Sequence, residues 1–267
     1  MQVSRSGYYA WGKSESIILN KNETMLKEKI KTLFKKSRNT YGTRRMVKVM
    51  KDSGIEIGRF KARRLMKQLG LEARYPKKYR ATTDSQHKSA ILPNILDRQF
   101  NPSRPNEVWT ADISYVWTLE GFLYVATIMD LYSRQIVGWA IDDHMKTSLC
   151  LQALQMAYWR KKPASGLLHH SDRGSQYASN DYTAQLKNMG MQQSMSRKGN
   201  CWDNAPKERF FRSLKYECLY YERLSNKAMA KLCIIDYIAF YNGQRIHSSL
   251  AYKTPLAYEQ AFYRRVA

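Results

Sequence analysis

The sequence is short of acidic residues, cysteine, proline and long apolar runs. In 267 residues it has 22 Asp and Glu, 4 Cys and 7 Pro. The four cysteines lie far apart without a CxxC pair, so we expect reduced thiols and no structural zinc site. There is neither an 18-residue apolar run nor an apolar leader. We therefore expect a cytoplasmic protein and not a membrane protein.

Basic residues, in contrast, are abundant. The 45 Lys and Arg give a net charge of +23, and a bias of this size indicates a polyanionic partner, nucleic acid first of all. Residues 1–100 carry 24 basic and 8 acidic residues, whereas residues 101–267 carry 21 and 14. We therefore expect the N-terminal part to bind DNA more strongly.

The first 73 residues have the pattern of a small helical domain. Apolar residues recur at helical spacing in residues 23–37, where Asn22 is the expected N-cap, and again after Gly42 and in residues 59–69. The last two helices, joined by a turn that contains glycine, suggest a helix-turn-helix. Its expected DNA contacts are Arg44, Arg45, Arg63 and Arg64. The alternative is a helical bundle with a solvated basic face.

A basic, proline-containing linker is expected over residues 74–105, followed by an α/β domain over residues 106–267. Three strands with tight connections predict an antiparallel meander, and the later elements alternate between helix and strand, which implies a mixed sheet with helices on its faces. Trp109, Trp117, Trp139 and Tyr124 are expected in its core. The expected strands are 108–118, 122–130, 135–142 and 166–171, and the expected helices are 147–161, 179–188, 205–221 and 226–242.

Three acidic residues stand at the edges of these core elements. Asp112 lies in the first strand, Asp172 ends the strand that can lie beside it, and Glu208 falls in the first turn of a helix whose expected cap is Asn204. Mg²⁺ prefers oxygen ligands, and two such ions can activate an attacking oxygen and stabilise a leaving one. The alternative is structural, with a turn aspartate, a surface ion pair and a carboxylate at a helix N-terminus.

Basic side chains surround the third acid. Arg212 and Lys215 follow Glu208 at i+4 and i+7, so they share its helical face and are expected to contact phosphate. Arg197 and Lys198 precede a glycine in a loop and are also expected to bind DNA.

The sequence resembles the DDE transposases with a retroviral-integrase-like core, specifically the OrfB proteins of bacterial copy-out/paste-in insertion sequences. The resemblance rests on several motifs in the right order, and 35 residues separate Asp172 from Glu208, as is typical of that family. The N-terminal SRSGYYAW and the stretch YGTRRM…GLEA also match. The main motifs are WTADISY (109–115), HSDRGSQY (170–177), SMSRKGNCWDNAPKERFFRSLKYE (194–217) and YNGQRIHSSLAYKTP (241–255).

The resemblance implies an RNase H-like fold with a five-stranded mixed sheet, preceded by the helix-turn-helix domain. It further implies that Asp112, Asp172 and Glu208 are catalytic and hold two Mg²⁺ ions, with Mn²⁺ as a substitute. The implied reaction is cleavage of transposon-end DNA, followed by strand transfer from the freed 3′-hydroxyl. The implied partners are terminal inverted repeats, target DNA, further copies of the chain on DNA, and an upstream OrfA protein or fusion. The expected location is the bacterial nucleoid.

Lys207 departs from the family pattern, where an uncharged residue is expected; we expect this lysine to tune phosphate contact without disturbing Glu208 itself. Two other functions remain open at this point. One is an RNase H-like nuclease without strand transfer, and the other is a DNA-binding regulator with an inactive core.

Overall fold

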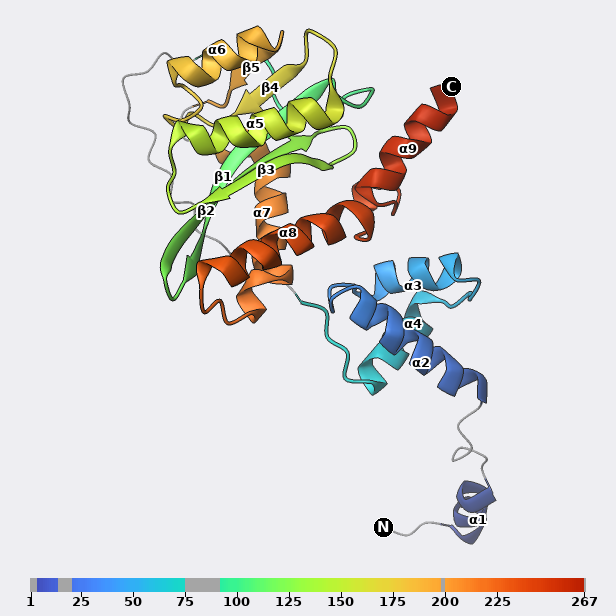
Figure 1. Ribbon diagram of the computed structural model, residues 1–267. Helices are drawn as coiled ribbons and strands as arrows, with labels where there is room; N and C mark the ends of the chain where they lie inside the picture. Colours follow the sequence, from blue (N-terminus) through green and yellow to red (C-terminus); the bar gives the residue numbers. More distant parts are fainter. Residues whose placement is uncertain (1–3, 14–20, 75–91, 198–199, 267) are drawn as a thin grey trace. The chain divides into compact units, whose positions relative to one another are not determined.

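The computed structural model describes residues 4–13, 21–74, 92–197 and 200–266. It divides into two compact units, Met1–Ala73 and Arg74–Ala267 (Figure 1). Residues 75–91 of the predicted linker lie outside the described residues.

The first unit is helical. The two helices of the predicted helix-turn-helix, after Gly42 and from residue 59, are present. Their apolar residues pack inward, and Met46, Met50 and Leu65 are fully buried. Asn22 is not the N-cap of the helix that was expected over residues 23–37, because this helix already begins at Lys21. The elements are α1 (Arg5–Lys13), α2 (Lys21–Lys36), α3 (Thr43–Asp52) and α4 (Arg59–Gln68).

The second unit contains a mixed five-stranded sheet with the order β3-β2-β1-β4-β5, which confirms the predicted fold class. The first three strands form the antiparallel meander, and β4 and β5 run parallel to β1. The strands are β1 (Val108–Thr118), β2 (Gly121–Asp130), β3 (Ile136–Asp142), β4 (Leu168–Ser171) and β5 (Gln192–Met195).

Helices cover both faces of the sheet (Figure 1). On one face α5 and α6 bury Trp109, Ile128 and their neighbours. On the other face α7 and α8 pack against Val116, Leu123 and Met129. Among the helices of the described ranges, none is long and apolar enough to span a membrane. The helices of this unit are α5 (Thr147–Lys161), α6 (Asn180–Asn188), α7 (Ala205–Glu217), α8 (Lys227–Gly243) and α9 (Pro255–Val266), and the 3₁₀ turn η2 (Cys201–Asn204) precedes α7.

The prediction that Trp117 lies in the core is wrong, since 61% of its surface is exposed. Trp117 pairs with Phe122 next to the β1–β2 turn. At this end the two strands extend past the β1–β4 and β2–β3 pairing, which spans Val108–Thr110 and Tyr124–Met129 respectively. The sequence around Trp117 has the apolar pattern of a buried strand, but here β1 and β2 extend beyond their neighbouring strands, so Trp117 is left exposed. Trp109, in contrast, is fully buried.

Candidate active site

Asp112 lies in the central strand β1, just beyond the end of its pairing with β4. It pairs with Thr127 of β2, whereas β4 pairs only as far as Thr110. Its carboxylate accepts a 2.8 Å hydrogen bond from the backbone N–H of Ile113. Because the parallel strand has ended at this point, the side of β1 that bears Asp112 is open to groups from the following loop and from α7.

Asp172 immediately follows β4, the parallel neighbour of β1. The backbone N–H of Gly174 donates a 3.0 Å hydrogen bond to Asp172 Oδ1. A Cβ at Gly174 would lie 3.1 Å from that same oxygen, so the turn has little room for a larger residue. The end of β4 thus holds the carboxylate in a tight turn beside β1.

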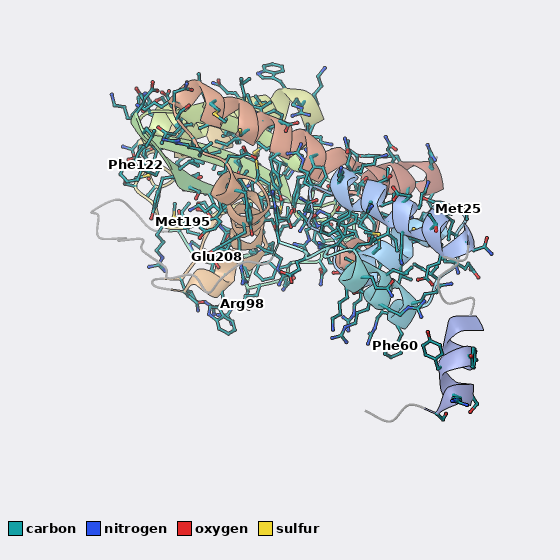
Figure 2. The ribbon with its side chains drawn as sticks, turned by 90° about the horizontal axis from the view of Figure 1, so that it is seen from below. Met25, Phe60, Arg98, Phe122, Met195 and Glu208 are labelled. Atoms are coloured by element: carbon teal, nitrogen blue, oxygen red, sulfur yellow. The ribbon has the colours of Figure 1, made fainter. Side chains whose placement is uncertain are left out.

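Glu208 comes from α7 (Figure 2), and its side chain is exposed to solvent. The side chain of Asn204 does not cap this helix, contrary to the prediction. Its amide instead donates a 3.1 Å hydrogen bond to the carbonyl of Ala111, the residue before Asp112. The bond attaches the start of α7 directly to β1 beside Asp112, and Glu208 lies in the first turn of this helix.

The three acids share one electrostatic environment. The pKa of Asp112 is well above its ordinary value, first because the group is buried and next because Asp172 lies near it; Glu208 adds a smaller effect in the same direction. Partial desolvation also raises the pKa of Glu208, although its side chain remains exposed. Carboxylates held close to one another repel unless a cation is present. The donor set is all oxygen, which fits a hard divalent cation.

Lys207 is a cation whose charge acts on Asp112, and its burial does not fit the expectation that it tunes phosphate contact. The side chain is fully buried, and within the described part of the chain Nζ has no hydrogen-bond partner. It lies 5.5 Å from the ring centre of Phe210. Burial lowers the pKa of Lys207, and the negative charge of Asp112 opposes this shift. Lys207 therefore faces the acids from inside the protein and is not accessible to DNA.

A second acidic group lies at the end of β3. Ligand atoms of Asp142, Asp143 and His144 all lie within 4.8 Å of one another, a distance compatible with one ion. Among the described residues, Asp112, Asp172 and Glu208 do not form such a compact group. Asp143 is also 3.8 Å from Lys227, and surface acids at strand ends are common without a metal.

The turn before α7 is held by a buried carboxylate that sequence reasoning did not identify. Asp203 is fully buried and accepts hydrogen bonds from Arg197 (2.9 and 3.0 Å), Arg98 (2.8 Å) and Asn94 (3.0 Å). These contacts, with the Arg197 hydrogen bond the largest, hold the pKa of Asp203 below its usual range. Trp202, beside it, is 70% exposed. Arg197 thus organises the turn while remaining partly exposed.

The other predicted DNA contacts of the core lie on α7 or in its preceding loop. Lys215 Nζ lies 4.8 Å from the ring centre of Tyr115, and burial lowers the pKa of this lysine. Arg212 is exposed on the same helix. Lys198 lies outside the described residues.

In the helical unit, Arg44, Arg63 and Arg64 are exposed, as a DNA-binding face requires. The guanidinium of Arg64 lies 3.0 Å from Glu23 of α2. The guanidinium of Arg45 lies 5.7 Å from the ring centre of Tyr41, so its side chain is partly covered.

A buried ion pair braces the far end of α7. Arg245 donates to both carboxylate oxygens of Glu217 at 2.6 and 2.7 Å, and the hydroxyl of Tyr237 donates to one of them at 2.7 Å. The tail motif that contains Arg245 and His247 therefore supports the helix that carries Glu208.

Comparisons with known proteins cover nearly the whole chain. Residues 102–201 and 189–255 each match an integrase core domain model, and residues 21–79 match an HTH-like domain model. The chain is 44% identical to the insertion element IS600 uncharacterized 31 kDa protein of Shigella sonnei, over 99% of this chain and 98% of that protein.

Two transposases are also similar. The transposase InsF for insertion sequence IS3A of Escherichia coli K12 is 34% identical, over 97% of this chain and 91% of the relative. The transposase for insertion sequence element IS904 of Lactococcus lactis is 37% identical, over 88% and 94%. Among solved structures, a chain of the simian T-cell lymphotropic virus intasome aligns with a TM-score of 0.52 at 16% identity, over 66% of this chain and 60% of that one.

Proposed function

Because the chain belongs to the IS3 family of insertion-sequence transposases, we propose that it cuts the DNA ends of its element and joins them to a target. The observation that supports this most directly is the convergence of Asp112, Asp172 and Glu208 from β1, the end of β4 and α7. Burial and then the nearby Asp172 raise the pKa of Asp112, and a bound cation would offset both effects.

In this proposal, the three carboxylates hold two Mg²⁺ ions, or Mn²⁺ in their place. When bound, the metal supplies activation of the attacking oxygen and stabilisation of the leaving oxygen. Asp112 on β1 and Asp172, just after the parallel strand β4, orient the scissile phosphate, and Glu208 closes the site from α7. The hydrogen bond from Asn204 to Ala111 holds the start of α7 against β1.

The DNA-binding surfaces follow from the exposed cations. We assign the contact with the terminal inverted repeat to the exposed residues of α3 and α4, where Arg44, Arg63 and Arg64 lie. Near the acids, Arg212 and Lys215 are the proposed phosphate contacts, with Arg197 and Lys198 as secondary ones. Target DNA, further copies of the chain and an upstream OrfA protein complete the proposed assembly.

The test is an assay with duplex oligonucleotides that end in the terminal repeat of the element, with Mg²⁺ and the full chain together with OrfA. We expect nicked product and then joined product. Asp112→Asn, Asp172→Asn and Glu208→Gln should each abolish both products while DNA binding persists. Asp181→Asn, which neutralises an exposed acid in the first turn of α6, is the matched control and should keep both activities.

The outcomes separate the alternatives. Nicking without any joined product, even when a free 3′-hydroxyl is supplied, would favour a simple nuclease. DNA binding without nicking at any metal concentration would favour a regulator. Wild-type nicking in any one of the three variants would refute the assignment of that acid.

A further inference from the structure

The helix α4 carries a large apolar side chain in an otherwise cationic surface. Phe60 is 80% exposed, more than any other large apolar residue among those described (Figure 2). Five of the ten residues of α4 are Lys or Arg, and none is acidic. An isolated exposed apolar residue is common on protein surfaces, so exposure alone assigns no role. Its surroundings do.

The position of Phe60 is held by the opposite side of the helix. Ala62 and Leu65 are fully buried, Met66 is 5% exposed, and α4 packs on both α2 and α3. Phe60 is the second residue of α4, after the N-cap Gly58. The packing therefore fixes the side of the helix from which Phe60 projects.

The neighbouring charges limit what can cover Phe60. The guanidinium of Arg59 lies 5.8 Å from the Phe60 ring centre, and Lys61, Arg63 and Arg64 are exposed on the same short helix. An apolar protein partner would have to desolvate these cations, whereas DNA phosphates neutralise them. In an HTH-like unit the N-terminal residues of the second helix are those that reach base edges in the major groove.

The major groove offers few apolar groups, and the C5 methyl of thymine is the characteristic one. We propose that Phe60 contacts a thymine methyl in the DNA that α4 binds, and so contributes to choosing the sequence, while the flanking cations hold phosphates. This inference rests on the proposed function only in that the helical unit binds DNA. It does not depend on the carboxylate site.

The experiment uses the full chain in EDTA, so that binding is measured without cleavage. A tight-binding duplex is first selected from a randomised pool, and each thymine is then replaced by uracil, which removes only the methyl. The wild type should lose about four-fold in affinity at one or two positions, the effect expected for one methyl leaving apolar contact. Phe60→Ala should bind the thymine and uracil duplexes equally at those positions.

Met25→Ala is the matched control, because Met25 is another exposed apolar residue, 58% exposed on α2 (Figure 2). It should retain the wild-type difference between thymine and uracil. A wild type that is indifferent to every replacement would overturn the inference, and so would a Phe60→Ala variant that keeps the difference. Equal weakening of all duplexes by Phe60→Ala would also overturn it. If nicking of element ends is intact in these cases, only this inference fails, whereas a chain that binds no duplex refutes the proposed function as well.

Discussion

Two neighbouring histidines on β4 should make the stability of the second unit sensitive to acid, and His169 allows the effect to be measured. His169 is fully buried beside Trp109, its register partner on β1. One ring nitrogen lies 3.0 Å from the hydroxyl of Tyr182, and the other has no partner within the described part of the chain. Burial is the largest cause that lowers the pKa of His169, to about 3. The perturbation is His169→Gln, which removes the titrating group.

The direction of the change in stability depends on whether the folded or the unfolded chain is protonated first as the pH falls. The unfolded chain protonates His169 near pH 6.5, whereas the folded chain resists until about pH 3. Stability contributed by the neutral imidazole is therefore complete above pH 6.5 and is lost as the pH falls. At pH 5 the loss is about 2 kcal/mol, from about 1.5 pH units at about 1.4 kcal/mol each. This loss of stability at pH 5 hardly changes if the pKa of His169 in the folded chain lies one unit higher. His170, with a pKa lowered by burial to about 4, adds a similar loss.

The assay is urea unfolding at pH 7.5 and pH 5, followed by tryptophan fluorescence. Asp112 and Glu208, whose raised pKa values act in the opposite direction, cancel when the wild type is compared with His169→Gln. The variant should lose about 2 kcal/mol less than the wild type between the two pH values. Tyr182→Phe is the control. It removes the hydroxyl but keeps the imidazole, so it should lower stability at both pH values and retain the wild-type pH dependence. Identical pH dependence in the wild type and His169→Gln would refute the reasoning.

Three further outcomes are expected. Arg245→Met leaves Glu217 buried without its ion pair and should lower the free energy of unfolding by about 3–5 kcal/mol, measured by urea denaturation; a loss below about 1 kcal/mol would show that the pair is not a brace. Asp112→Asn removes a buried charge and its repulsion with Asp172, so without metal it should raise the melting temperature by about 2–4 °C per kcal/mol gained. Mg²⁺ should stabilise the wild type more than this variant, and calorimetry with and without Mg²⁺ measures both effects. DNA affinity should fall steeply with salt, and Arg63→Gln should reduce the slope of log K against log salt by about 1; an unchanged slope in a titration series would remove Arg63 from the phosphate contacts.

Local patterns were sufficient where an apolar segment is bounded by clear turn or cap signals. The helices α3 and α4 lie close to their predicted ranges because buried residues recur at helical spacing, and the strands β1 to β3 do so because short apolar runs end at turns. Strand β5 was not predicted, since QQSM has little apolar character; its Ser194 is buried by hydrogen bonds to His170 and to the backbone of Ile95. Helix α9 was missed as well. Residues 192–195 form a strand because they pair with β4, and the sequence of this short segment does not reveal that pairing.

The amino-acid sequence alone determined the family of this protein and indicated the proposed chemistry, through its net charge of +23, three carboxylates predicted at the edges of core elements, and motifs in the order of one transposase family. Only the tertiary structure decided what the polar groups near those carboxylates do. It turned Lys207 inward, attached Asn204 to β1 and tied Arg197 to Asp203. The reason is physical: a residue's type defines which bonds it can form, whereas burial and the partners that the fold brings from distant segments decide which of them it forms.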